Sequence, residues 1–212
     1  MGMKPSKFND IACEAGKYEN FTGLIMWGDN EGIVENACFK IEEWIHSKAI
    51  LFYSGVWLNG IWDYGIWKIG TWEDGIWEDG IWKDGVWHGG IWKNGKWHNG
   101  SWYDGVWKNG IWKSGIWKNG TWKNGVWYYG WWYGGIWESG TWENGIWVAG
   151  TWQNGDWYGG TWMNGTWKSG RWKGGIWEDG TWQNGDWYGG TWKDGIDGNS
   201  KSHLNSPNLW KK

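Results

Sequence analysis

A five-residue alternation of one large apolar position with polar positions runs through most of the chain. From Trp57 to Trp192 a tryptophan stands at every fifth residue, 28 in all, and a glycine follows each of them at the third position. Residues 51–55, Leu-Phe-Tyr-Ser-Gly, fit the same frame with phenylalanine in place of tryptophan. A fixed short period is typical of proteins in which stacked copies of one small unit form the core. The pattern therefore predicts an array of 29 pentads over residues 51–195.

Each position of the pentad has its own chemical character. The residue before tryptophan is mostly Ile, Val or Thr, which favours strands, and the Asn-Gly or Asp-Gly pair at the end favours tight corners with positive φ. Side chains alternate across a strand, so tryptophan points away from both neighbours. The position before tryptophan admits charges at Lys96, Asp156, Arg171 and Asp186, and must face water. We therefore expect the tryptophans to point inward.

Two all-β architectures satisfy this pattern. In a β-solenoid, about four pentads would form one square coil, giving about seven coils. A weaker period of ten, in which residues 151–160 recur identically as 181–190, favours that coil. The alternative is an antiparallel β-meander ribbon of three-residue strands. We favour the solenoid, because it buries tryptophan within one chain, whereas the ribbon leaves a bare tryptophan face.

The alternation of large and small residues resembles the pentapeptide-repeat β-solenoids. Tryptophan holds the central, inward position and glycine stands two places before it, as in residues 60–62 and 120–122. The resemblance covers residues 51–195 and rests on period rather than on shared identities. The Asp or Asn that this family carries before its central residue is missing here, apart from Asp156 and Asp186. More loosely, the array is similar to Trp/Gly pentad proteins of large DNA phages, which implies a virion-associated role.

The segments on either side of the array differ from it in composition. Residues 1–50 contain enough apolar side chains to form an N-terminal cap or docking segment, built from irregular coils, short strands or a helix over 36–48. Residues 196–212 are polar and predict a tail, or a strap whose Trp210 covers the last coil. Cys13 and Cys38 both precede the array, so disulfides do not stabilise it, and whether these two are bridged stays open.

Charge and candidate chemistry narrow the function. Twenty basic and 23 acidic residues give a net charge of −3, so we expect neither a nucleic-acid nor a membrane partner. We see no secretory signal peptide and no apolar run of about 18–20 residues, and we expect a cytoplasmic or virion-associated protein. We expect the four histidines to be solvated surface residues, and the many carboxylates of the array lie in exposed or corner positions of a convex surface. Catalysis needs a concave, partly dry site, so we predict no enzyme activity, cofactor or metal.

The favoured function is a rigid structural module, such as a spacer or a component of a viral or surface assembly. Its flanks or solenoid ends would mediate self-association or contact with a protein partner. The alternative is a binding module whose exposed tyrosines stack on glycans and whose lysines form a basic girdle for an acidic partner. The candidate surface residues are Tyr103, Lys108, Lys113, Lys118, Lys123, Tyr128, Tyr133, Tyr158 and Tyr188.

Overall fold

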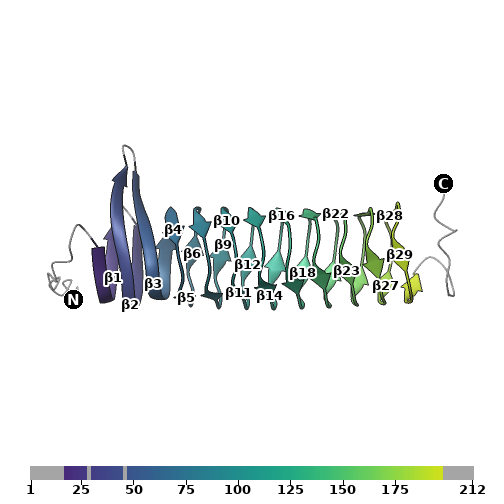
Figure 1. Cartoon of the computed structure of the whole chain (residues 1–212), viewed down its shortest axis with the longest axis horizontal. Helices are drawn as coiled ribbons and strands as arrows, with labels where there is room; N and C mark the ends of the chain where they lie inside the picture. Colours follow the sequence, from purple (N-terminus) through teal and green to yellow (C-terminus); the bar gives the residue numbers. More distant parts are fainter. Residues whose placement is uncertain (1–16, 28–29, 45–46, 198–212) are drawn as a thin grey trace, which may run out of the picture.

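The computed structural model describes residues 17–27, 30–44 and 47–197, and every regular element among them is a β-strand. Three long strands come first: β1 (Lys17–Trp27), β2 (Asn30–Trp44) and β3 (Ser47–Trp62). The short strand β4 (Gly65–Trp67) follows. Figure 1 shows that the elements succeed one another along one long axis. The described residues include no helix of the length and apolarity that crossing a membrane requires.

The remaining strands are very short, one strand per pentad. They are β5 (Thr71–Trp72), β6 (Ile76–Trp77), β7 (Ile81–Trp82), β8 (Val86–Trp87), β9 (Ile91–Trp92), β10 (Lys96–Trp97), β11 (Ser101–Trp102), β12 (Val106–Trp107), β13 (Ile111–Trp112), β14 (Ile116–Trp117), β15 (Thr121–Trp122), β16 (Val126–Trp127), β17 (Trp131–Trp132), β18 (Ile136–Trp137), β19 (Thr141–Trp142), β20 (Ile146–Trp147), β21 (Thr151–Trp152), β22 (Asp156–Trp157), β23 (Thr161–Trp162), β24 (Thr166–Trp167), β25 (Arg171–Trp172), β26 (Ile176–Trp177), β27 (Thr181–Trp182), β28 (Asp186–Trp187), β29 (Thr191–Trp192) and β30 (Ile196–Asp197).

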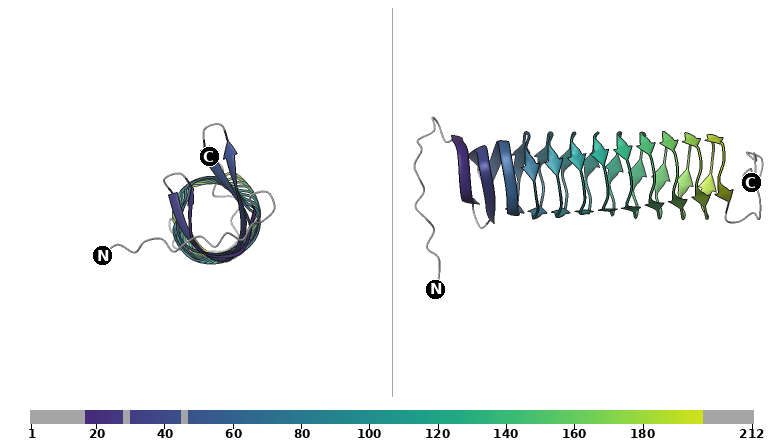
Figure 2. Two further views of the ribbon diagram at one scale, coloured as in Figure 1. Left: turned by 90° about the vertical axis from the view of Figure 1, so that its left-hand side faces the viewer. Right: turned by 90° about the horizontal axis from the view of Figure 1, so that it is seen from below.

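Each short strand pairs in parallel with the strand three pentads further along the chain. Trp72 pairs with Trp87, and Trp87 pairs with Trp102. One coil therefore contains three pentads, and three parallel ladders run along the array. Seen along its axis, the array has a closed, rounded outline (Figure 2). The predicted all-β solenoid is confirmed, as is the inward central position that the pentapeptide-repeat resemblance implies. The antiparallel meander is wrong, because these strands pair in parallel and across one whole coil.

We call the three ladders the first, second and third wall, and we identify each by the aromatic residues that it turns inward. The first wall carries every third tryptophan of the array from Trp57 to Trp192. The second wall carries those from Trp62 to Trp182, and the third wall carries Phe52 followed by Trp67 to Trp187.

The predicted square coil of four pentads is wrong, and the size of the indole ring explains why. Consecutive tryptophans around a coil meet edge to face, with ring centroids 6.0 Å apart for both Trp107–Trp112 and Trp112–Trp117. Three such rings, each touching the next, already fill the interior of a coil. The ten-residue sequence period does not correspond to a structural period. Residues 151–160 recur six pentads later, which is two coils, so both copies occupy the same walls.

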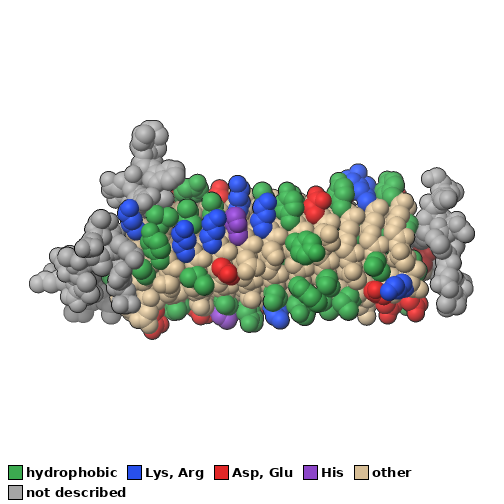
Figure 3. Space-filling view, viewed as in Figure 1, with side chains coloured by type: hydrophobic (Ala, Val, Ile, Leu, Met, Phe, Trp, Pro, Cys, Tyr) green, Lys and Arg blue, Asp and Glu red, His purple; other side chains and the backbone are tan. Residues whose placement is uncertain are grey.

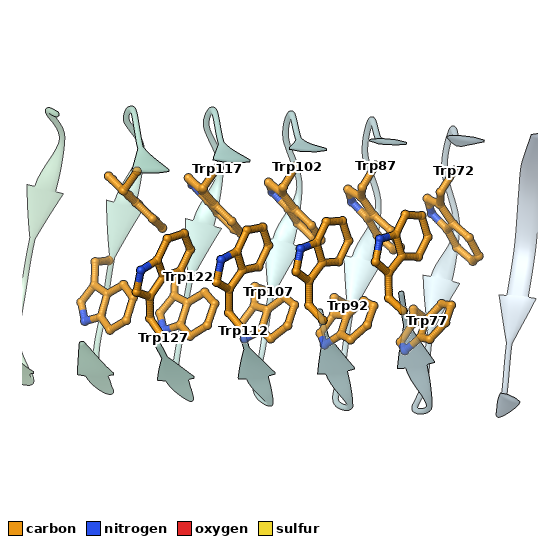
Figure 4. Packing of buried hydrophobic residues seen from close by; sticks show 14 of the residues in the cluster. Trp72, Trp77, Trp87, Trp92, Trp102, Trp107, Trp112, Trp117, Trp122 and Trp127 are labelled. Carbon is orange, nitrogen blue, oxygen red and sulfur yellow. The ribbon is translucent and has the colours of Figure 1, made fainter. Parts of the chain in front are cut away.

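Tryptophan stacking along each wall forms the core. The rings of Trp97 and Trp112 lie 4.7 Å apart and are tilted by only 6°, and the same geometry recurs from coil to coil (Figure 4). The tryptophans at every fifth residue from Trp57 to Trp182 are at most 1% exposed, whereas Trp187 and Trp192 in the last coil are half-buried. The prediction that tryptophan points inward is confirmed. Each ring removes roughly 200 Å² from water, a gross stabilisation of about 5 kcal/mol at ~25 cal/mol/Å².

The corners need glycine for backbone reasons, as the Asn-Gly and Asp-Gly pairs predict. Gly120 has φ +114°, and a Cβ on it would lie 2.5 Å from the carbonyl oxygen of Gly105 in the preceding coil. The residue before the glycine contributes too, because Asp104 Oδ1 accepts a hydrogen bond of 2.7 Å from the N–H of Gly105. Between coils, the N–H of Lys96 donates to the carbonyl of Gly80 at 2.9 Å. Neighbouring coils thus approach closely only where no side chain intervenes.

The N-terminal end is closed by an antiparallel sheet. β1 pairs with β2, β2 pairs with β3, and β3 also pairs in parallel with β4, β5 and β6. The same strand therefore belongs to the sheet and to the first coil. Its Phe52 stacks on Trp67 with centroids 4.0 Å apart, so the aromatic core begins inside β3.

The predicted helix over 36–48 is wrong. The described residues of that range belong to β2 and β3. Along β2, Val34, Ala37 and Phe39 are buried, whereas Glu35 is exposed, which is the two-sided pattern of a strand. Cys38 is half-buried, while its possible partner Cys13 lies outside the described residues. The predicted strap with Trp210 also lies outside them.

Candidate functional site

The residue after each tryptophan points outward, so every wall presents one column of such residues. The nine candidate surface residues divide among the walls: Tyr103, Lys118 and Tyr133 on the first, Lys108 and Lys123 on the second, and Lys113, Tyr128, Tyr158 and Tyr188 on the third. The four lysines of consecutive pentads therefore encircle the coil instead of sharing a face. Lys123 lies one coil beyond Lys108.

On the second wall, acidic residues lie at both ends of the lysine column. In coil order the column reads Glu78, Lys93, Lys108, Lys123 and Glu138. Lys93 Nζ lies 2.7 Å from a carboxylate oxygen of Glu78, and Lys123 Nζ lies 3.8 Å from one of Glu138. Lys93 and Lys123 thus have carboxylates beside them, whereas Lys108 between them has none within 4.0 Å among the described residues.

The N-terminal half of the third wall carries an uncompensated column, which we call the basic ladder: Lys68, Lys83, His98 and Lys113 in successive coils, with Lys96 beside His98. Among residues 17–27, 30–44 and 47–197, no carboxylate lies within 4.0 Å of any of these lysines. Partial burial lowers the pKa of His98 below its usual value of 6.5, and the charges of Lys83, Lys113 and Lys96 lower it further. In Figure 3 a row of Lys and Arg side chains with a histidine among them runs along the N-terminal half of the array.

The C-terminal half of the third wall is built differently. Arg171 donates two hydrogen bonds of 2.6 Å to Asp156, one coil earlier, and this pairing raises the pKa of Arg171. Lys173 donates to the hydroxyl of Tyr158 at 2.8 Å, which raises the pKa of Lys173, and it lies 3.7 Å from Asp156. Sequence reasoning missed this cluster because a coil of four pentads places Asp156 and Arg171 on different walls. Their spacing of three pentads is the signal that could have found it.

Exposed aromatic rings lie mostly near the middle of the array. Trp131 is 45% exposed and lies beside Tyr133, with ring centroids 6.0 Å apart and planes 20° apart. Lys118 Nζ lies 4.3 Å from the centroid of Tyr133, and Lys113 Nζ lies 4.4 Å from that of Tyr128. Trp131 is absent from the sequence-based candidates. The doublet Trp131-Trp132, in which the first residue occupies the solvent-facing position, was the available signal.

An open groove follows the corner between the second and third walls. It has a volume of about 620 Å³ and is lined on one side by Asp79, Asn94, Asn109 and Asn124. Their side chains form a hydrogen-bonded row: Asn124 donates to Asn109 at 3.3 Å, Asn109 to Asn94 at 3.2 Å, and Asn94 to Asp79 at 3.3 Å. The other side of the groove includes Lys96 of the basic ladder. The groove thus combines amides, the carboxylate of Asp79 at one end of their row, the cation of Lys96 and aliphatic side chains.

Metal-binding residues do not gather anywhere in the part of the chain that the structure describes: no group of three or more His, Cys, Asp and Glu could hold an ion there. His88 and His98 occupy different walls, and His88 stacks on Tyr103 with centroids 5.1 Å apart.

Comparisons with known proteins add little to this geometry. No protein-family model matches the chain, and no curated protein matches it either. Among solved structures, a putative acetyltransferase from Desulfovibrio desulfuricans G20 is similar at 5% identity and a TM-score of 0.15. The match covers 69% of this chain and 60% of that protein, so the chain spans less than two thirds of its length. At that TM-score the likeness carries no argument.

Proposed function

We propose that this chain is a rigid, non-enzymatic spacer, a rod that holds whatever its two ends contact at a fixed distance. The supporting observation is the uninterrupted aromatic core. On the first wall ten tryptophans stack in sequence from Trp57 to Trp192, and no coil lacks its ring. Because interior rings are close-packed on every side, bending the rod would separate rings or break hydrogen bonds between coils. Nine steps at about 4.8 Å give a rod of about 43 Å.

The ends of the rod support the same proposal. At the N-terminal end, the sheet of β1, β2 and β3 covers the first coil and offers a surface unlike the rest of the rod. In the last coil Trp187 and Trp192 are half-buried. Such ends suit attachment to a partner protein or to another copy of the chain. A component of a viral or surface assembly is the setting that this design fits best.

Rigidity is testable by distances between spin labels. Asp63 and Lys168 occupy the same exposed column of the second wall, seven coils apart. With Cys13 and Cys38 replaced by Ser, labels on Asp63→Cys and Lys168→Cys should give one narrow distance distribution centred near about 34 Å, from seven steps of about 4.8 Å. A broad distribution would refute the rigid spacer.

A matched pair of deletions sharpens this test. Removing residues 106–120 deletes one whole coil and should shorten the label distance by about 4.8 Å while leaving the distribution narrow. Removing residues 106–115 deletes two pentads, which shifts every later pentad to another wall. The two-pentad deletion should therefore move the second label to another wall, so that the label distance includes a component across the rod as well as one along it. An identical response to the two deletions would contradict the proposed coil.

A further inference from the structure

We propose that the N-terminal half of the third wall binds a linear acidic polysaccharide along the basic ladder. This site is separate from the spacer function, because the ladder lies on the side of the rod and the spacer acts through its ends. The ligand class follows from three features of the wall: its uncompensated charge, the spacing of that charge, and the polar groove beside it.

The first feature is charge without an internal counterion. Like charges on neighbouring strands repel each other, so a column of cations is unfavourable unless something compensates it. On the second wall Glu78 and Glu138 compensate two of the three lysines, Lys93 and Lys123, and in the C-terminal half of the third wall Asp156 compensates Arg171. No described carboxylate does this for the basic ladder. An anionic ligand would supply the missing charge.

The second feature is spacing. Each coil of the ladder carries a lysine, with Lys96 supplying it in the coil of His98, and successive coils lie about 4.8 Å apart along a convex wall. A linear polymer with one charge per repeating unit can follow such a wall. Duplex DNA carries one charge per about 1.7 Å of axis, far denser than the ladder. Single-stranded nucleic acids are held by aromatic rings that stack on successive bases. Beside the ladder the column before tryptophan holds Ile66, Ile81, Lys96 and Ile111, and Tyr128 follows one coil beyond Lys113.

The third feature is the groove that adjoins the ladder. Lys96 belongs to both, so one ligand can contact the ladder and the groove together. Each asparagine amide has two N–H donors and a carbonyl acceptor. The row of Asn94, Asn109 and Asn124 uses one N–H of each side chain, leaving the other for a ligand. Sugar hydroxyls are suitable partners for these amides. Tyr128, exposed at the end of the ladder, offers a ring for sugar stacking.

The test compares two triple variants in binding assays with dextran sulfate, polygalacturonate and neutral dextran. One variant, Lys68→Gln, Lys83→Gln and Lys113→Gln, removes three charges from the ladder. Its matched control, Lys93→Gln, Lys108→Gln and Lys123→Gln, removes the same charge from the same position of the pentad on the second wall. All six side chains are at least partly exposed, so both variants should fold, which circular dichroism and label distances verify.

We expect the unaltered chain to bind at least one acidic polymer and not dextran. The ladder variant should bind about tenfold more weakly or worse, while the control changes by less than about twofold. Binding should also weaken as salt rises. Equal losses in both variants, no binding by the unaltered chain, or tighter binding to a thymidine oligonucleotide of equal charge would each overturn the proposal. A spacer that is rigid but binds no polymer would refute this inference alone.

Discussion

The N-terminal sheet and the pentad array are two different solutions to burying a core. The sheet uses three long antiparallel strands, and its register shifts at several points, for example between Tyr18 and Phe21. Its buried residues vary in size, from Ala37 to Phe39. The array uses very short strands and one kind of core side chain. A uniform stack can be extended coil by coil, whereas closing its end requires an irregular surface that fits one place only.

This contrast predicts where the chain is most sensitive to change. In a linear repeat protein each unit contacts only its neighbours, so stability is close to a sum over adjacent coils. A tryptophan inside the array has rings stacked on both sides, and one in the last coil has a ring on one side only. Substitutions at the centre, at the corners and at the junction with the sheet should therefore differ in a graded way.

The largest effect is expected from a tryptophan at the centre of a stack. Trp122 lies 4.8 Å from both Trp107 and Trp137, so Trp122→Ala leaves a cavity that these rings cannot fill. We expect a loss of about 3–5 kcal/mol in the free energy of unfolding, measured by denaturant titration. The control is Trp192→Ala in the last coil, which is already half-buried and should cost less than half as much. Equal costs would contradict a core built from interior stacks.

The next effect concerns the corners. Gly120→Ala forces a side chain into positive φ and against the Gly105 carbonyl, and should cost about 3 kcal/mol. Gly134 is the matched control, because its φ is not positive and the nearest backbone atom, the oxygen of Lys118, would lie 3.6 Å from a Cβ. Gly134→Ala should change stability by less than about 1 kcal/mol. Thermal unfolding of the two variants side by side separates the cost of backbone strain from the general effect of replacing a glycine by alanine.

These corners also show how much of the array could be predicted. The pentad frame, the inward tryptophan and the glycine corner follow from residue types that alternate at a fixed period. The number of pentads per coil does not, because it depends on how far three indoles reach across the interior. Period-ten similarities such as residues 151–160 and 181–190 suggested four walls. They are equally compatible with three walls, since six pentads make two coils.

The prediction of the candidate surface depended on the number of pentads per coil. Residues such as Lys113 and Tyr128 could be recognised as exposed from their position in the pentad. The sequence did not reveal which of these residues share a wall, because neighbours on a wall are three pentads apart. The pairing of Asp156 with Arg171 and the contact of Lys113 with Tyr128 both follow that spacing. The N-terminal sheet was the least predictable part, because no repeat constrains it.

A smaller effect is expected where the sheet meets the array. Gly32 of β2 packs against the six-membered ring of Trp57, and a Cβ on Gly32 would overlap that ring. Gly32→Ala should displace Trp57 and cost about 1–2 kcal/mol. The loss should be local, so hydrogen exchange should speed up in β2, β3 and the first coil while amides near Trp122 keep their protection. Uniform loss of protection along the rod would mean that sheet and array unfold as one cooperative unit.

The smallest effect tests the charge difference between two walls. Burial and the neighbouring lysines lower the pKa of His98 in the folded chain. Because the folded pKa lies below the unfolded value, the stability associated with this group is complete above about pH 6.5 and is lost as pH falls from there through the lower pKa of the folded chain. Lys83→Gln removes one repelling charge and should raise the pKa of His98, measured by NMR titration. Lys93→Gln, on the second wall, should leave it unchanged. If both variants raise that pKa equally, the basic ladder is not a separate electrostatic unit, and the contrast between a compensated and an uncompensated wall fails with it.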